Sequence, residues 1–325
     1  MKMQKVHGSG NDFFILDQQD LDSNLTEEQL RELTKKVCDR TNGLHGGADG
    51  ILYVQEGHKD TDGRMRVINA DGSEASMCGN GIRTVARYLS EKKNLNNFKI
   101  QTMYADLQVK KSDDLANGVQ AYDAEISPVS FNAADLGMNI GQDKLIDGKI
   151  EKLSPTLKFS AVAVPNPHLI AFVNKEVLEG DTLGEIASYL NDGKNEIFPD
   201  GVNVSFVHIL DDKKIFVRTF ERGVGYTNAC GTAMSASSLM YHMLYSDQVA
   251  LEEKITVINP GGMVNTIVHK NQDGNYWMSL IGNATVVANV EINQEKALAG
   301  NFAGYSWDET GEQEKYEKFI NTIKE

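Results

Sequence analysis

The sequence predicts an α+β protein made of two related domains. The first reason is a repeated motif: Met77-Cys78-Gly79-Asn80-Gly81 and Ala229-Cys230-Gly231-Thr232-Ala233 each open an apolar, helix-like run. The second is that short strand-like segments alternate with few helices along the chain. The third is a length of 325 residues, which suits two ordinary domains.

The repeat extends beyond the two cysteines. Matching landmarks recur in the same order and at nearly the same interval, which indicates a duplication and not a chance match of three letters. The three pairs are Asn11 with Asn166 (166 − 11 = 155), Gly50 with Gly201 (201 − 50 = 151) and Cys78 with Cys230 (230 − 78 = 152). We therefore expect one domain over residues 1–130 plus 284–325 and a second over 131–283.

In the first half, the run Phe13–Leu16 suits a buried strand. A helix is expected over Thr26–Asp39, because Thr26 and Gln29 have the spacing of a capping box. Gly81–Lys92 has apolar residues at helical spacing, which predicts a helix at least half buried. Two further strands are expected, over Arg64–Asn69 and Lys99–Thr102.

In the second half, Thr182–Leu190 is predicted as a helix with a Thr182/Glu185 capping box. Ala233–Tyr245 is a helix rich in Ala, Ser and Met, a composition that lets a helix lie close inside a surrounding sheet. Asn132–Leu153 is expected to be the crossover between domains, and Glu312–Lys324 a charged peripheral helix. The expected strands are Lys214–Phe220, Lys254–Ile258, Met263–His269, Tyr276–Ile281 and Ala284–Ile292.

Composition excludes several classes of function. A net charge of −14 and a pI near 5.0 argue against nucleic-acid and anionic-membrane partners, which require clustered Lys and Arg. No apolar run approaches the ~20 residues of a membrane helix and the first residues lack the apolar core of a signal peptide, so we expect a cytoplasmic protein. Three cysteines without a C-x-x-C spacing exclude a disulfide scaffold and a zinc ribbon.

The paired cysteines predict acid–base chemistry. A helix N-terminus carries unpaired N–H groups and a partial positive charge, which stabilise a thiolate and also bind a carboxylate. With one cysteine from each half, a thiolate can remove a proton from a carbon while the facing thiol returns one on the opposite side. The expected reaction is inversion of a carbon next to a carboxylate.

Other candidates divide into structural and functional ones. Cys38 lies inside a predicted helix and is expected to be a small buried residue. Gly8-Ser9-Gly10 is followed by a strand-like run, which argues against a nucleotide loop. His168 lies on a predicted loop, where it could hold backbone or touch substrate. Glu221-Arg222 lie nine and eight residues before Cys230 (230 − 221 = 9; 230 − 222 = 8), which favours a role in the site.

These motifs resemble those of the diaminopimelate epimerase family, which interconverts LL- and meso-2,6-diaminopimelate without pyridoxal phosphate. They occur in family order over nearly the whole chain up to about residue 292. They are His7-Gly8-Ser9-Gly10-Asn11-Asp12-Phe13, Asn69-Ala70-Asp71-Gly72-Ser73, Met77-Cys78-Gly79-Asn80-Gly81-Ile82-Arg83, Asn166-Pro167-His168, Asn203, Glu221-Arg222-Gly223-Val224-Gly225 and Ala229-Cys230-Gly231-Thr232.

The resemblance implies a role for each matching residue. Cys78 and Cys230 would be the two acid–base thiols. The helix N-terminal residues would bind the carboxylate of the reacting carbon, namely Gly79, Asn80, Gly231 and Thr232. Asn11 and His168 would line the reacting end. The distal amino-acid head would be held by Asn69, Asn166, Asn203 and Arg222, with Glu221 meeting its ammonium group.

The resemblance also implies a fold and an assembly. Each domain would be a curled, barrel-like mixed sheet around a central helix, with the active site in the cleft between domains and the last strand returning to the first domain. The ligand would be a small molecule, no cofactor or metal would be needed, and the protein would be a homodimer for lysine and peptidoglycan biosynthesis.

Some positions depart from the family pattern and leave alternatives open. They are Ala233, Pro165, Asn283, Tyr226 and the tail from about Ala297 to Glu325. None of them removes a thiol or a clamp residue. One alternative is another two-thiol racemase, of the proline or hydroxyproline type, whose smaller substrate would not need the whole distal clamp. The other is a non-catalytic cleft-binding protein, which would have no need for two cysteines at helix N-termini.

Overall fold

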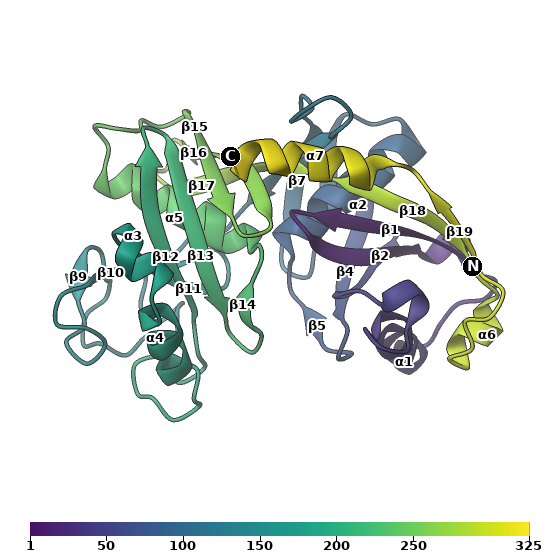
Figure 1. Ribbon diagram of the computed structural model, residues 1–325, viewed down its shortest axis with the longest axis horizontal. Helices are drawn as coiled ribbons and strands as arrows, with labels where there is room; N and C mark the ends of the chain where they lie inside the picture. Colours follow the sequence, from purple (N-terminus) through teal and green to yellow (C-terminus); the bar gives the residue numbers. More distant parts are fainter. Residues whose placement is uncertain (325) are drawn as a thin grey trace. The chain divides into compact units, whose positions relative to one another are not determined.

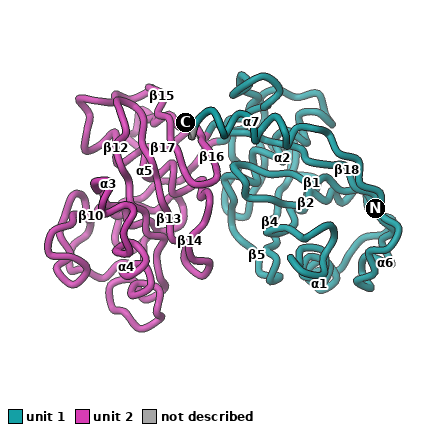
Figure 2. Tube along the Cα trace, in the orientation of Figure 1, with its two compact units in different colours: residues 1–124, 281–325 teal, residues 125–280 magenta. Residues whose placement is uncertain are grey.

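The computed structural model describes residues Met1–Lys324, which form two compact units (Figures 1 and 2). Unit 1 is Met1–Ala124 with Ile281–Glu325, and unit 2 is Glu125–Leu280. Unit 2 begins six residues earlier than expected, after residue 124 and not after residue 130 (130 − 124 = 6). It ends three residues earlier than expected, at residue 280 and not at residue 283 (283 − 280 = 3). The segment expected to cross between domains, Asn132–Leu153, lies wholly in unit 2, because its apolar side chains are buried in that unit's core.

Unit 1 is a mixed ladder of strands in the order β19-β18-β1-β2-β3-β4-β6-β7-β8, with the short β5 on β4. The pairs β2–β3 and β4–β6 are parallel and the rest antiparallel. The strands are β1 (Lys2–Gly8), β2 (Asn11–Asp17), β3 (Gly50–Gln55), β4 (Gly63–Asn69), β5 (Glu74–Ala75), β6 (Asn97–Gln101), β7 (Asp106–Lys111), β8 (Ala121–Ile126), β18 (Thr285–Glu291) and β19 (Ser306–Glu309).

Unit 2 repeats this ladder as β9-β10-β11-β12-β13-β15-β16, with the short β14 on β13. Its parallel pairs, β11–β12 and β13–β15, occupy the places of β2–β3 and β4–β6. This shared order confirms the predicted duplication. The strands are β9 (Gly148–Lys149), β10 (Lys158–Ala163), β11 (Pro167–Phe172), β12 (Asn203–Asp211), β13 (Lys214–Glu221), β14 (Gly225–Thr227), β15 (Lys254–Asn259) and β16 (Gly262–Lys270), and β17 (Tyr276–Asn283) returns to unit 1.

Each unit holds one central helix. In α2 (Gly79–Lys93) every residue from Gly79 to Arg87 is buried, and in α5 (Gly231–Leu244) every residue from Gly231 to Tyr241 is buried. A helix buried on all sides is surrounded by other elements, here the strands of its own unit (Figure 1). The remaining helices are α1 (Glu27–Cys38), α3 (Lys175–Glu179), α4 (Thr182–Leu190), α6 (Gln294–Leu298) and α7 (Glu312–Lys324), with short 3-10 turns at Gln18–Asp20 and Leu44–Gly46.

The apolar run in β2 is buried on both faces. Phe13 and Ile15 pack in the core around α2, whereas Phe14 and Leu16 pack on the opposite side of the strand with α1. A strand that is covered by a helix on each face has a continuous apolar sequence, and Phe13–Leu16 has this pattern.

Capping explains where two helices begin. Thr26 Oγ1 accepts the Gln29 N–H and the Gln29 side chain accepts the Thr26 N–H, so the predicted capping box is confirmed. The box predicted for Thr182 and Glu185 is wrong. Asp181 is the N-cap and no side chain caps it, because Thr182 is already the first helical residue.

The tail after β18 is an integral part of unit 1. β19 pairs with β18, and Tyr316 and Ile320 of α7 are buried against Val119. Glu312 forms an ion pair with the buried Arg87 of α2. The helix predicted to be charged and peripheral, α7, therefore also has an apolar face, and that face packs on unit 1. Within the described chain, no helix is long and apolar enough to span a membrane.

Candidate active site

Cys78 is the N-cap of α2. Its backbone is extended (φ −137°, ψ 113°), and its Sγ accepts the Gly81 N–H at 3.3 Å. The sulfur thus occupies the place of a capping oxygen, beside the positive end of the helix. Cys230 has the same extended backbone (φ −121°, ψ 110°) and is the N-cap of α5. The prediction of a cysteine at each helix N-terminus is confirmed.

Asn11 brings an oxygen to the first cysteine. Its Oδ1 lies 3.6 Å from Cys78 Sγ and accepts a hydrogen bond from Asn80 Nδ2 at 3.3 Å. The amide is oriented from its other end, where Nδ2 donates to Asp49 Oδ2 at 2.5 Å. Asp49 in turn pairs with Arg40 at 2.6 Å. This network fixes which end of the Asn11 amide points at the sulfur.

The other predicted residues of unit 1 lie nearby in the chain. Gly79 is the first residue of α2, where backbone N–H groups have no partner within the helix. Asn69 is the last residue of β4, and its Nδ2 donates to Ser73 Oγ at 3.0 Å. The main-chain N–H of Asn69 donates to the Ser73 carbonyl, which closes a tight turn after the strand.

Cys230 is more buried than Cys78 and lies beside an acid. Burial raises the pKa of the Cys230 thiol well above its usual value, and the negative charge of Glu221 raises it further. Thr232 Oγ1, 3.4 Å from the sulfur, opposes this by hydrogen bonding. In this arrangement the neutral thiol is the favoured form of Cys230.

The remaining residues of unit 2 form a second polar group. His168 Nε2 lies 3.1 Å from Asn166 Oδ1, and His168 is in register with Asn203 across the parallel pair β11–β12. Asn203 Oδ1 accepts the Arg222 N–H at 2.8 Å, and Arg222 Nη1 donates to the Asp200 carbonyl at 2.9 Å. These amides and the guanidinium provide directional hydrogen-bonding groups at one end of three neighbouring strands.

The prediction that His168 lies on a loop is wrong. The residue lies on β11, and it is fully buried. Burial and the charge of Arg222 lower the pKa of His168 to about 3, so the imidazole is neutral at physiological pH.

Three further residues support the first cysteine and were given no role from the sequence. Asp49 orients Asn11, the buried Arg83 donates to Asn80, and Asn283 accepts the Ser9 N–H at 2.8 Å. Arg83 stood in the recognised motif and Asn283 stood out as a departure from it. Their contacts join segments up to 274 residues apart, which sequence patterns cannot show.

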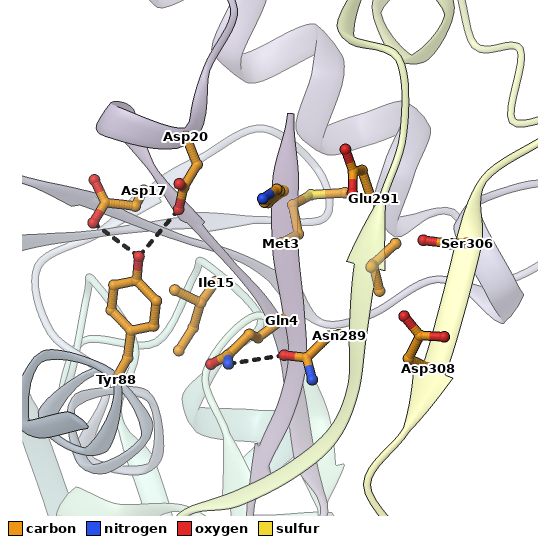
Figure 3. A pocket seen from close by; sticks show the side chains of 12 residues that line it. Met3, Gln4, Ile15, Asp17, Asp20, Tyr88, Asn289, Glu291, Ser306 and Asp308 are labelled. Atoms are coloured by element: carbon orange, nitrogen blue, oxygen red, sulfur yellow. Dashed lines mark hydrogen bonds between the residues drawn. The ribbon is translucent and has the colours of Figure 1, made fainter. Parts of the chain in front are cut away.

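A cavity of about 360 Å³ lies elsewhere on unit 1, along β1, β18 and β19 (Figure 3). In it the Tyr88 hydroxyl lies within hydrogen-bond distance of two carboxylates, 3.0 Å from Asp17 Oδ2 and 3.2 Å from Asp20 Oδ2. Its lining includes none of the predicted site residues. Across Met1–Lys324, no three His, Cys, Asp or Glu side chains are grouped as a metal site.

The structure thus defines a duplicated α+β protein in which a cysteine is the N-cap residue of the central helix of each half. The same fold occurs in a PhzF-family phenazine biosynthesis protein from Bacillus anthracis, with a TM-score of 0.63 at 17% identity over 90% of this chain and 99% of that one. At that identity the likeness concerns the fold alone.

The chain belongs to the diaminopimelate epimerase family, whose model matches residues 3–125 and 160–287. It is 72% identical over 320 residues to the diaminopimelate epimerase of Ligilactobacillus salivarius, with 98% of each chain covered. It is 57% identical over 327 residues to that of Lactiplantibacillus plantarum, covering 99% of this chain and 98% of the relative. Both cysteines and all the predicted site residues lie within the ranges matched by the family model.

Proposed function

We propose that this protein is a cofactor-independent isomerase that interconverts LL- and meso-2,6-diaminopimelate for lysine and peptidoglycan biosynthesis. The observation that carries the proposal is the pair of cysteines, each an N-cap of a buried central helix, in a chain of the diaminopimelate epimerase family. An N-cap sulfur beside a helix N-terminus is placed to be a base or an acid and not merely to fill a core.

The reaction is a proton exchange at one carbon. One cysteine, as thiolate, removes the α-proton, and the electron pair of the broken C–H bond spreads into the adjacent carboxylate. The other cysteine, as thiol, gives its proton to the opposite face of that carbon, which inverts the configuration. Atoms and charge balance, since one thiolate and one thiol are present before and after the step.

The carboxylate next to the reacting carbon needs stabilisation as negative charge develops on it. Backbone N–H groups at the first turns of α2 and α5 supply it, together with the side chains of Asn80 and Thr232. Asn11, whose Oδ1 lies 3.6 Å from Cys78 Sγ, lines this end of the substrate together with His168.

The second amino-acid head of diaminopimelate needs a polar socket. We propose that Asn166, Asn203 and Arg222, joined by the contacts described above, provide it with Asn69, and that Glu221 meets the distal ammonium. A site that hydrogen-bonds both ends of a substrate rejects analogues that lack one end, because its polar groups would be left unpaired.

The test is α-proton exchange followed by NMR. Reduced protein, freed of metals and pyridoxal phosphate, is incubated with LL-diaminopimelate in deuterated water. Loss of the α-proton signal with appearance of the meso isomer is expected. Cys78→Ala and Cys230→Ala should each lower the rate by at least about 10²–10⁴, the range for removal of an acid–base group.

Cys38→Ala is the matched control. Cys38 is buried in α1, and burial raises the pKa of its thiol to about 12, so its removal should leave the exchange rate unchanged. Exchange with proline or hydroxyproline but not with diaminopimelate would overturn the substrate. Failure of exchange with every amino acid tested would overturn the isomerase and favour a binding protein.

We also propose that the protein is a cytoplasmic homodimer. The family membership supports the dimer, and the three cysteines, which form no disulfide within Met1–Lys324, suit a reducing compartment. Sedimentation equilibrium at micromolar concentration should give twice the mass of the 35.9 kDa chain. A single-chain mass would contradict the dimer.

A further inference from the structure

Arg83 is a buried cation beside the first cysteine. The residue is 0% exposed, five positions after Cys78 on α2. Its guanidinium donates to the Gly79 carbonyl at 3.0 Å, to Asn80 Oδ1 at 3.1 Å and to the Asn283 carbonyl at 3.4 Å. Among residues 1–324 no carboxylate forms an ion pair with Arg83, in contrast to Arg87 one turn later, which pairs with Glu91 and Glu312. Burying a charge without a counter-ion costs free energy of folding, so a buried guanidinium at this position suggests a function.

The guanidinium is held in a narrow slot. A Cβ added at Gly8 would lie 2.9 Å from Arg83 Nη2, and one added at Gly282 would lie 2.9 Å from its Cζ, Nε and Nη2. Two glycine backbones therefore pack against the guanidinium, and any larger residue would collide with it. The slot fixes where the charge lies relative to the first turn of α2.

Among the titratable groups around Arg83, Cys78 has the largest electrostatic effect on it, and the others are neutral or paired. Burial lowers the pKa of His7 to about 4, and burial raises the pKa of Tyr316, so both are neutral near pH 7. Lys5 and Asp12, which also act on His7, pair with each other. Burial lowers the pKa of Arg83 to about 10, and the electrostatic interaction with Cys78 opposes this, so Arg83 remains a cation at pH 7.

The second unit has a neutral residue at the same place. Arg83 and Ser235 each follow their cysteine by five positions (83 − 78 = 5; 235 − 230 = 5). Each donates to the carbonyl four residues back at 3.0 Å, Arg83 to Gly79 and Ser235 to Gly231. The two side chains therefore satisfy the same helical carbonyl, one with a positive charge and one without.

A second difference has the opposite sign. Asn69 ends β4 nine residues before Cys78, and Glu221 ends β13, the corresponding strand, nine residues before Cys230 (78 − 69 = 9; 230 − 221 = 9). Near Cys78 the two positions hold a cation, Arg83, and an amide, Asn69. Near Cys230 the corresponding positions hold a hydroxyl, Ser235, and an anion, Glu221. Both substitutions favour negative charge on the first sulfur and disfavour it on the second.

We propose that Arg83 is a positioning residue that holds Cys78 as the thiolate in the resting protein, while Cys230 beside Glu221 rests as the thiol. On the proposed function, the resting enzyme then takes the α-proton from the isomer that presents it to Cys78. Turnover leaves Cys78 protonated and Cys230 as thiolate. The return to the resting form occurs by turnover of the opposite isomer or by proton exchange with water.

The test measures thiolate formation without substrate. The pH dependence of alkylation by iodoacetamide is followed for the Cys78 and Cys230 peptides separately by mass spectrometry. In the unmutated protein the midpoint for Cys78 should lie below that for Cys230. Arg83→Gln, which keeps hydrogen-bond donors and removes the charge, should raise the Cys78 midpoint by on the order of one pH unit or more, as expected for loss of a nearby opposite charge.

Two variants separate charge from packing. Arg83→Lys should keep the Cys78 midpoint close to that of the unmutated protein. Arg87→Gln removes a neighbouring buried guanidinium that has its own carboxylates, and it should leave the Cys78 midpoint unchanged. Circular dichroism establishes that each variant is folded before alkylation.

An unchanged Cys78 midpoint in folded Arg83→Gln would overturn the proposal, as would a Cys230 midpoint below that of Cys78 in the unmutated protein. If Arg83→Gln does not fold, two other results test the proposal: the Cys78 midpoint must lie below the Cys230 midpoint in the unmutated protein, and it must stay close to that value in Arg83→Lys. Because no substrate is present, failure of diaminopimelate exchange would overturn the proposed function and leave this result standing.

Discussion

Gly282→Ala tests the slot that holds Arg83. The new Cβ would lie 2.9 Å from three atoms of a guanidinium that is fully buried and held by three hydrogen bonds, so the guanidinium cannot simply move aside. Overpacking a core costs about 1–3 kcal/mol. Loss of one hydrogen bond of a charged group adds about 1.5–3 kcal/mol. We therefore expect the free energy of unfolding of unit 1 to fall by about 3 kcal/mol.

Tryptophan fluorescence can report this loss for unit 1 alone. The chain has two tryptophans, Trp307 on β19 of unit 1 and Trp277 on β17 in unit 2. In a Trp277→Phe background, urea unfolding followed by fluorescence reports unit 1. Because the free energy of unfolding falls by about 1–3 kcal/mol per molar urea, Gly282→Ala should lower the urea midpoint of unit 1 by roughly 1 M or more.

Gly180→Ala is the matched control. A Cβ at Gly180 would lie 3.4 Å from the Glu176 carbonyl, which is ordinary contact, and Gly180 has a negative φ of −77°. Read through Trp277 in a Trp307→Phe background, this change should stay within about 0.5 kcal/mol. If Gly282→Ala left both the urea midpoint and the Cys78 alkylation midpoint unchanged, the slot would not be tight and the reasoning would fail.

Three further predictions concern the groups around the first cysteine. Asn283→Ala leaves the Ser9 N–H and the His7 carbonyl without their buried partner, so it should lower the free energy of unfolding of unit 1 by about 1–3 kcal/mol in the same urea assay. Asn289→Ala, which removes an exposed hydrogen bond with Gln4, should have little effect. Equal urea midpoints for the two variants would contradict this prediction. Burial lowers the pKa of His7 to about 4, against about 6.5 in the unfolded chain, so between these pH values the unfolded state binds the extra proton and the free energy of unfolding falls as pH falls. This decrease reaches up to about 3 kcal/mol and should be smaller in His7→Gln. An identical pH dependence of stability in the two proteins would refute the prediction. Diamide should join Cys78 to Cys230 and abolish activity reversibly with dithiothreitol; activity that survives demonstrated loss of both free thiols would show otherwise.

Local patterns predicted the elements that depend on neighbouring residues. The capping box at Thr26, the buried strand from Phe13 and the cysteine caps of α2 and α5 all follow from residues within a few positions of each other. The duplicated ladder could also be predicted, because a repeat of landmarks at a constant interval requires both halves to fold alike. These features need no knowledge of distant contacts.

The tail and the support of Cys78 could not be predicted in this way. β19 is the short segment Ser306–Glu309, whose polar composition gives no strand signal, and it is a strand because β18 offers it a free edge. The role of Asn283 depends on Ser9, 274 residues away in the chain. Such contacts are set by the tertiary fold, after the local elements have formed.

The differences between the two halves matter as much as their likeness. Inversion by two thiols requires one thiolate and one thiol at the same time. Two identical thiols in one site share their protons without preference, and the singly protonated pair dominates only over a narrow range of pH. A cation at Arg83 beside one sulfur and an anion at Glu221 beside the other separate the two titrations, so the singly protonated pair persists over a wider range. On the proposed function, duplication supplies one N-cap cysteine in each unit, and the departures from it at positions 69/221 and 83/235 decide which sulfur starts as base.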